Sequence, residues 1–379
     1  MADTTRIRVV FDGHVLTPHR SGIGEYARQL LPAMLRCCAD QVALHLYTPS
    51  GIVPVRTEDE IETLARDVRE GDFFRLHHQW RLPRLLRQGH YDVYHSPDFL
   101  IPFRSSIPVV STIHDLIPLA HPEFLRKSMK VRLLPLYRLA VQTAVRRSAR
   151  VLTVSAYSKA DIVRRLSAPS EKVDVVHVAA GLTPPADAPV ALPHAALEDG
   201  RFLLYVSRHD PYKGLGLLLR AFARLLAEGS EPNLRLAVAG KRDARYPYDA
   251  LVQELALHDR VLFLDYVSRD QLSALYARAL GLVFPSLYEG FGLPLLDAME
   301  HGTPVLSSNR ASLPEVGGEA AQYFDPENHE EFVRALKTFV ESGSLRQTLI
   351  EKGNGRVRQF SWDQTAQATV ESYRRAVRK

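Results

Sequence analysis

Cysteine is scarce in this sequence, and long apolar runs are absent from it. The chain of 379 residues contains two cysteines, Cys37 and Cys38, and neighbours in sequence seldom form an unstrained disulfide. We therefore expect a reducing compartment and no thiolate metal site. No run reaches the roughly 18 apolar residues of a membrane-spanning helix, and the N-terminus lacks the apolar stretch of a signal peptide. These absences predict a cytoplasmic protein.

Three missing patterns narrow the function classes. A G-x-S-x-G segment does not occur, so Ser155 is interpreted as a helix cap and not as the nucleophile of a serine hydrolase. Basic and aromatic residues are not interleaved, which argues against nucleic acid as a partner. A D-x-D segment is also absent, and we expect no metal ion held by the protein.

The composition and the apolar pattern indicate two α/β domains. With 46% apolar and 24% charged residues, the chain has material for about two domains of ordinary size. Short runs rich in β-branched residues alternate with helical patterns throughout, which is typical of parallel sheets. The expected strands of the first half are 7–13, 42–48, 91–95, 109–114, 151–155 and 173–179. Those of the second half are 202–207, 234–239, 261–265, 281–285 and 304–308.

A proline-rich stretch without periodicity, residues 181–200, separates the two halves. We expect two Rossmann-like domains facing each other across a cleft, one over 1–180 and the other over 201–360. Residues 361–379 begin with Ser361 as an N-cap and end with basic residues, so they predict a terminal helix.

A glycine-rich loop opens the first expected helix. Residues 22–27 satisfy G-x-G-x-x-A, which can bind a dinucleotide. About nine residues separate it from the first strand, and the second strand ends without an acid for a ribose hydroxyl, so an NAD-dependent oxidoreductase is disfavoured. Gly22, Ile23 and Gly24 could still direct N–H groups at a phosphate. A loop that only needs the conformational freedom of glycine is an equal alternative.

Two cations follow the first strand of the second half. Arg208 comes directly after residues 202–207, and Lys213 lies where the next helix begins. Open α/β sheets bind ligands beyond the carboxyl ends of their strands, so these side chains could clamp a diphosphate. Cations on ordinary surface loops produce the same pattern.

The segment YEGFGLPLLDAME, residues 288–300, places two carboxylates after the strand at 281–285. Glu289 falls on a loop, where its carboxylate and neighbouring N–H groups suit sugar hydroxyls. Asp297 falls about one turn into the next helix and could accept hydrogen bonds from a ribose diol. The alternative is a helix start with its usual negative charge. The loop residues after Glu289 are Gly290, Phe291, Gly292 and Leu293.

The run SLYEGFGLPLLDAMEHGTPVLSSN, residues 286–309, closely resembles the E-x7-E segment of retaining glycosyltransferases of family four, which have the GT-B fold. Further resemblances to that family are carried by SRHDPYKG, RSGIGEYARQLL, STIHDLIP and FSWDQTA. The resemblance spans nearly the whole chain. It implies a retaining hexosyltransferase of mannosyl or glucosyl type, which uses a GDP- or UDP-linked sugar without a cofactor or metal in bacterial envelope polysaccharide, lipopolysaccharide or glycolipid synthesis.

The resemblance also implies roles for residues of the second half. Glu289 would hold hydroxyls of the donor sugar, and Arg208 and Lys213 would hold the diphosphate. Asp297 would hold the ribose, although the family usually has Glu at this position. Its carboxylate then reaches about 1.5 Å less far, the length of one carbon–carbon bond.

In the first half, the resemblance places Gly22, Ile23 and Gly24 at the phosphates and His114 beside the transferred sugar. It also implies that the terminal helix returns to the N-terminal domain. From the residues alone, a histidine at a strand end with an adjacent acid, here Asp115, is better interpreted as structural.

The partners remain open at several points. A nucleotide-sugar epimerase of the same shape and a nucleotide-sugar-binding protein without turnover are alternatives to a transferase. The acceptor could be a glycan, a lipid-linked glycan or a small molecule. The basic segment 125–150 has apolar positions at roughly helical spacing, which suits an anionic membrane surface, an acidic substrate or simply a solvated face. We therefore also consider peripheral binding at the inner face of the cytoplasmic membrane.

Overall fold

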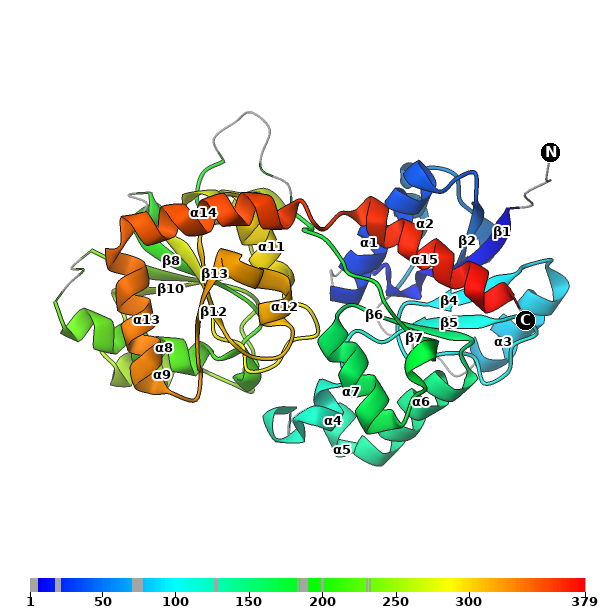
Figure 1. Ribbon diagram of the computed structural model, residues 1–379, viewed down its shortest axis with the longest axis horizontal. Helices are drawn as coiled ribbons and strands as arrows, with labels where there is room; N and C mark the ends of the chain where they lie inside the picture. The colour runs from blue at the N-terminus through cyan, green and yellow to red at the C-terminus, as the bar shows by residue number, and fades with distance from the viewer. Residues whose placement is uncertain are drawn as a thin grey trace. The chain divides into compact units, whose positions relative to one another are not determined.

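The computed structural model describes residues 6–17, 22–69, 78–125, 129–182, 184, 190–198, 201–229, 231 and 233–378. The chain divides into two compact units, each built on its own sheet (Figure 1). The first unit comprises Met1–Leu119, Leu133–Val178 and Phe360–Lys379. The second comprises Ala120–Arg132 and Ala179–Gln359.

The sheet of the first unit has the strand order β3-β2-β1-β4-β5-β6-β7. Its strands are parallel except β3, which forms an antiparallel hairpin with β2 at the sheet edge. Strands such as β1 and β4 are buried at successive positions because both faces of a parallel sheet are covered. The strands are β1 (Ile7–Asp12), β2 (Val42–Thr48), β3 (Gly51–Pro54), β4 (Val93–Ser96), β5 (Val109–Thr112), β6 (Arg150–Thr153) and β7 (Val173–Val175).

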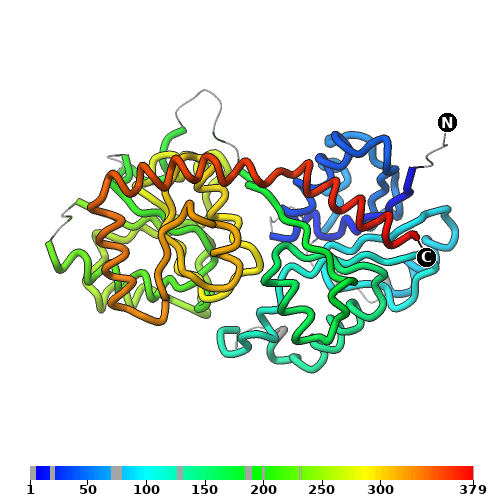
Figure 2. Tube along the Cα trace, viewed as in Figure 1, coloured from blue at the N-terminus to red at the C-terminus, as the bar shows by residue number. Residues whose placement is uncertain are grey.

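The α-helices between these strands, in chain order, are α1 (Gly22–Cys37), α2 (Glu58–Ala65), α3 (His78–Gln88), α4 (Ile117–Ala120), α5 (Met129–Arg132), α6 (Leu134–Arg147) and α7 (Ala156–Leu166). The terminal helix α15 (Trp362–Val377) packs against α1 in this unit (Figure 2). Ser361 caps α15 by accepting from the Gln364 amide. Buried His95 ties the helix to the sheet, with Nδ1 at 2.6 Å from the Tyr373 hydroxyl and Nε2 at 2.8 Å from Thr112 Oγ1.

The second unit has a parallel sheet in the order β10-β9-β8-β11-β12-β13. Its core lies between this sheet and the apolar faces of helices such as α8 and α13, around Phe222, Phe332 and Phe339. The strands are β8 (Phe202–Val206), β9 (Arg235–Ala239), β10 (Val261–Asp265), β11 (Gly281–Phe284), β12 (Val305–Ser308) and β13 (Ala321–Phe324). The helices are α8 (Leu215–Ala227), α9 (Asp249–Glu254), α10 (Arg269–Arg278), α11 (Leu293–Glu300), α12 (Leu313–Gly317), α13 (His329–Glu341) and α14 (Gly343–Val357).

Each expected strand has a counterpart, and the sequence pattern missed β3 and β13. The roughly helical spacing of apolar positions over 125–150 does not correspond to one continuous helix. Residues 126–128 lie outside the described residues, and α5 and α6 are separate helices. Pro135 explains the break, since proline fits the first turn of a helix but not its interior.

The expected domain boundaries differ from the structure in two segments. Residues 120–132 group with the second unit, although the sequence assigned them to the first. The described part of 181–200 also groups with the second unit instead of standing apart as a linker, while residues 183, 185–189 and 199–200 lie outside the described residues. No helix in the described chain is long and apolar enough to cross a membrane.

Candidate functional site

Two loops meet at the carboxyl edge of the second sheet. Strands β8 and β11 are hydrogen-bonded neighbours, so the loops that follow them emerge side by side. The Leu287 amide donates to the Tyr212 carbonyl at 2.7 Å. Gly214 has φ of +74°, and a Cβ atom there would lie 2.2 Å from the Pro285 carbonyl oxygen. Only glycine permits this close approach.

The close approach brings Lys213 and Glu289 together. Lys213 Nζ donates to Glu289 Oε1 at 2.7 Å, and their side chains are only 14% and 12% exposed. The ammonium also lies 4.8 Å from the centre of the Tyr212 ring. Burial is the largest single influence and lowers the pKa of Lys213, but the charge of Glu289, its hydrogen bond and the neighbouring Tyr212 together outweigh burial and hold this pKa above its ordinary value. Lys213 is therefore a fixed, charged cation at neutral pH.

Arg208 lies at the same edge and is more open to solvent. Its guanidinium is 3.0 Å from Asp210 Oδ2, and its side chain is 69% exposed. The charge of Arg208 is close enough to oppose protonation of Lys213. The sequence prediction that these two cations share one edge is thus consistent with the geometry, and a ligand with two negative groups could use both.

The loop after Glu289 is rigidly held. Gly292 has φ of +111°, and a Cβ atom there would meet Leu313 Cδ2 at 2.6 Å. Ser312 Oγ donates to the carbonyl groups of Glu289 and Phe291 at 3.0 and 2.7 Å. Residues Gly290 to Gly292 lead directly into Leu293, the first residue of α11. The N-terminus of α11, which carries a partial positive charge, therefore lies at the carboxyl edge of the sheet.

Asp297 makes a backbone contact that was not predicted from the sequence. Its Oδ1 atom accepts hydrogen bonds from the amides of Gly181 and Leu182 at 2.8 and 3.1 Å. Arg269 donates to the Gly181 carbonyl from α10. The Asp297 carboxylate therefore anchors the chain where it enters the second unit. No sequence signal reveals this contact, because the partners are more than 100 residues apart.

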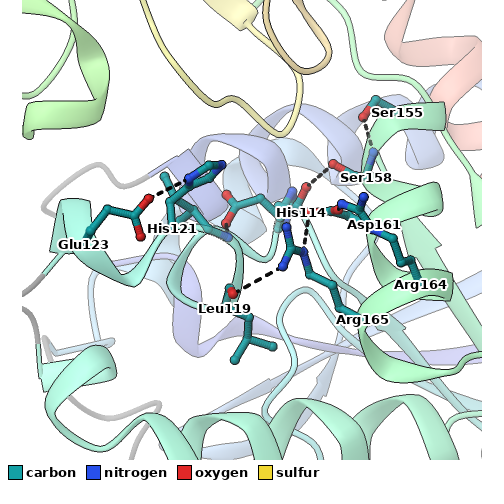
Figure 3. Close-up of polar contacts among 11 residues, drawn as sticks. His114, Leu119, His121, Glu123, Ser155, Ser158, Asp161, Arg164 and Arg165 are labelled. Carbon is teal, nitrogen blue, oxygen red and sulfur yellow. Dashed lines mark hydrogen bonds and ion pairs between the residues drawn. The ribbon is translucent and has the colours of Figure 1, made fainter.

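Residues 120–132 contribute aromatic contacts beside the same loops. The ring of Phe124 stacks on Tyr212 with centroids 6.5 Å apart, and His121 meets Tyr288 edge-on at 5.4 Å. His121 also pairs with Glu123 at 2.9 Å (Figure 3). The flanking residues of Lys213 and Glu289 thus pack against a segment that comes from the first half of the sequence.

In the first unit, Gly22, Ile23 and Gly24 form the first turn of α1. Residues 18–21, which precede α1 in the sequence, lie outside the described residues. Tyr26, one turn further along α1, meets the His114 ring edge-on at 4.9 Å. The structure therefore places the glycine turn and His114 on neighbouring elements of the first unit.

His114 follows β5 and is positioned by three contacts. Its Nε2 atom is 3.0 Å from the Pro97 carbonyl, and its own carbonyl accepts a hydrogen bond from Ser158 Oγ at 3.1 Å (Figure 3). Nε2 must carry the proton to donate to a carbonyl. Burial lowers the pKa of His114, so the imidazole is neutral at pH 7 and presents Nδ1 as an acceptor.

A buried polar cluster at the end of β1 was also missed. His14 Nδ1 lies 2.8 Å from Asp12 Oδ1, and the Tyr94 hydroxyl donates to Asp12 Oδ2 at 2.6 Å. Burial raises the pKa of Asp12, but its hydrogen bonds and electrostatic interaction with His14, together with the Tyr94 hydrogen bond, outweigh burial, and the net pKa is lowered. The only sequence signal was FDGH itself, an acid and a histidine directly after a strand.

Comparisons with known proteins agree with this architecture. The family model for glycosyl transferases group 1 matches residues 193–356, and the model for glycosyltransferase family 4 matches residues 20–179. The chain is 30% identical to the O-antigen chain mannosyltransferase B of Escherichia coli over 97% of this chain and 100% of the relative. It is 30% identical to the MMP alpha-(1->4)-mannosyltransferase of Mycolicibacterium hassiacum over 77% of this chain and 72% of the relative.

Solved structures share the fold. Sucrose-phosphate synthase from Thermosynechococcus elongatus matches with a TM-score of 0.74 and 21% identity, over 97% of this chain and 98% of that one. HepE from Anabaena, solved with UDP and glucose, matches with a TM-score of 0.69 and 18% identity, over 97% and 99% of the two chains. The two family models and the relatives show that the chain belongs to glycosyltransferase family 4, and its two α/β units match the GT-B fold. The chain is therefore a glycosyltransferase of the GT-B fold.

Proposed function

We propose that this glycosyltransferase moves a mannosyl- or glucosyl-type sugar from a GDP- or UDP-linked donor to an acceptor hydroxyl, with retention of anomeric configuration. The names of the two mannosyltransferase relatives support the sugar class. HepE was solved with UDP-glucose, which supports a nucleotide sugar as donor. The O-antigen relative supports a glycan or lipid-linked acceptor in envelope polysaccharide, lipopolysaccharide or glycolipid synthesis.

The buried Lys213–Glu289 pair is the observation that carries the proposal. A charged lysine in a partly dry site stabilises negative charge far better than one in water. As the bond between the anomeric carbon and the phosphate oxygen breaks, charge develops on the diphosphate. We assign Lys213, exposed Arg208 and the N-terminus of α11 to that charge, so that catalysis needs no metal ion.

Glu289 is assigned to the donor sugar. Its Oε1 atom is held by Lys213, and the rigid turn from Gly290 to Leu293 fixes the backbone around it. A carboxylate in this setting accepts hydrogen bonds from sugar hydroxyls in a defined orientation. The acceptor oxygen then bonds to the anomeric carbon on the face that the diphosphate leaves, and the acceptor proton passes to the leaving phosphate oxygen.

From the first unit we assign phosphate contact to Gly22, Ile23 and Gly24, because they form the first turn of a 16-residue helix. Neutral His114 is assigned to a hydroxyl of the transferred sugar, since its Nδ1 atom is an acceptor. Contact between Asp297 and the ribose requires the carboxylate to serve the ligand while it anchors Gly181 and Leu182.

The test is acceptor-dependent release of nucleoside diphosphate. The purified protein is first screened by thermal shift against GDP- and UDP-sugars, because a ligand that binds the folded state raises its Tm. The best donor is then incubated with and without candidate acceptors, in EDTA, and the anomeric configuration of the product is determined by NMR. Retention, acceptor dependence and resistance to EDTA are expected.

Three outcomes would overturn parts of the proposal. Donor consumption without any acceptor would indicate an epimerase or hydrolase. Donor binding without turnover would indicate a binding protein. Loss of transfer in EDTA, restored by a divalent cation, would contradict the assignment of the diphosphate charge to Lys213 and Arg208.

A further inference from the structure

Helix α6 in the first unit exposes leucines to solvent. Its inner face is buried through Tyr137, Val141, Ala144 and Val145. On the outer face the exposed fractions of Leu136 and Leu139 are 60% and 58%, and Leu133, just before the helix, is 48% exposed. Residues three apart lie on one side of a helix. Single exposed leucines are ordinary, but a stripe of them marks an interaction surface.

An arginine-rich pocket lies beside this stripe. Its volume is about 450 Å³, and helices α6 and α7 supply most of its walls. Leu134, Pro135 and Arg138 line it from α6, so the pocket shares the helix that carries the exposed leucines. The complete lining is Leu119, Leu134, Pro135, Arg138, Arg164 and Arg165.

The charge of the pocket is positive. Asp161 is paired with Arg164, and Arg165 Nε lies 3.1 Å from its other oxygen (Figure 3). The lining therefore contains three guanidinium groups, those of Arg138, Arg164 and Arg165, and the Asp161 carboxylate offsets part of their charge. The exposed fraction of the Arg164 side chain is 68%, so its charge is accessible from solvent.

A hydrogen bond and apolar side chains contribute to the walls of the pocket. Arg165 donates to the Leu119 carbonyl at 3.4 Å, which connects α7 to the end of α4 (Figure 3). Apolar groups of Leu119, Leu134 and Pro135 form the rest of the wall. A guanidinium cluster with apolar walls fits an anionic phosphate that is attached to an apolar group.

We propose that α6 and this pocket form a docking surface for an anionic lipid bilayer. Leu133, Leu136 and Leu139 enter the boundary between headgroups and acyl chains, and the pocket holds a headgroup phosphate. Charge complementarity selects this occupant, because exposed Arg146 and Arg147 continue the positive charge to the end of α6. The inference concerns binding only and is independent of the proposed donor and reaction.

The test measures the fraction of full-length protein that floats with vesicles. One vesicle type contains equal parts of phosphatidylglycerol and phosphatidylcholine, and the other contains phosphatidylcholine alone. The variants are Leu136→Ser with Leu139→Ser, and Arg138→Gln with Arg164→Gln. Matched controls are Val377→Ser, an apolar side chain that is 39% exposed on α15, and Arg220→Gln, an arginine that is 52% exposed on α8.

Wild type and both controls are expected to float with the anionic vesicles and to remain unbound with phosphatidylcholine. The arginine variant should lose about 25-fold in partition coefficient, about fivefold or 1 kcal/mol for each charge. The leucine variant should lose at least about tenfold. The leucine variant and both controls should keep the wild-type Tm, because the changed side chains are exposed. The arginine variant should stay folded, because buried Asp161 keeps Arg165 as its partner; its Tm is measured alongside.

Four results would refute the proposal. Wild type could fail to float, could bind both vesicle types equally, or could lose as much binding in the controls as in the variants. The fourth is a dimer in size-exclusion chromatography that the leucine variant converts to a monomer, since the stripe would then be an interface between two copies of the chain.

Discussion

The most informative perturbation separates the structural role of the Lys213–Glu289 pair from its catalytic role. The two side chains are joined at 2.7 Å and are less than 15% exposed. Removing one partner of a buried pair leaves an uncompensated charge and costs about 3–5 kcal/mol. We expect the lower end, about 3 kcal/mol, for Lys213→Met or Glu289→Gln alone, because both groups keep some contact with water.

The double variant Lys213→Met/Glu289→Gln distinguishes the two roles. It contains no buried charge at this position, so it should be less destabilised than either single variant, which for two losses of about 3 kcal/mol each means a coupling energy of more than about 3 kcal/mol. Transfer activity should not recover. If Lys213 lies at developing charge, its removal lowers kcat by about 10² or more, equivalent to about 2.7 kcal/mol.

The assays are urea unfolding followed by circular dichroism and initial rates of sugar transfer at saturating donor. The matched control is Lys337→Met in the same unit. It breaks an exposed ion pair in which Lys337 Nζ lies 2.9 Å from Glu228 Oε2. It should change stability by less than about 1 kcal/mol and leave transfer unchanged. Near-normal transfer by the double variant would refute the catalytic assignment and leave the pair a purely structural contact.

Three further outcomes are expected. Gly214→Ala should lower the free energy of unfolding by at least about 2 kcal/mol and reduce transfer. The control Gly229→Ala, at φ of +76° with open space around it, should lower it by only about 1 kcal/mol. Equal losses in urea unfolding would contradict the close approach of Gly214 to Pro285 after β11. Asp297→Ala should cost about 1–3 kcal/mol of unfolding free energy because two partly buried amides lose their acceptor, and Asp297→Asn should cost less because it keeps an acceptor oxygen. Equal losses would contradict the anchoring role. Burial lowers the pKa of His95 from 6.5 to about 3. The contribution of neutral His95 to the free energy of unfolding is therefore complete above pH 6.5 and decreases by up to about 5 kcal/mol as the pH falls to 3. If His95→Gln shows the same dependence of unfolding free energy on pH between 6.5 and 3, another group is responsible.

Local sequence patterns were sufficient to predict structural features that depend on residues close together in the chain. The alternation of apolar runs and helices predicted the parallel sheets, and the glycines and Pro294 predicted that Glu289 lies on a loop and Asp297 on the next helix. Ser155 and Ser361 were correctly expected as N-caps, because capping is a contact over three residues.

Patterns failed where an element is short, or is interrupted by a residue whose effect outweighs the periodicity. The edge strand β3 is four residues long, pairs with β2 and ends at Pro54, so its apolar run is too short and too close to proline to indicate a strand. The basic segment kept a helical spacing across Pro135, although proline could only begin a new helix there.

By itself, the sequence determined most of the secondary structure, the parallel sheets and the strand ends at which Arg208, Lys213 and Glu289 lie. Only the tertiary structure decided what those side chains touch. It joined Lys213 to Glu289 across 76 residues, gave the Asp297 carboxylate to the backbone at Gly181, and tied α15 to His95 across 278 residues. The physical reason is that periodicity and capping act within a few residues, whereas the partner of a buried charge is chosen by the packing of segments that are distant in the chain.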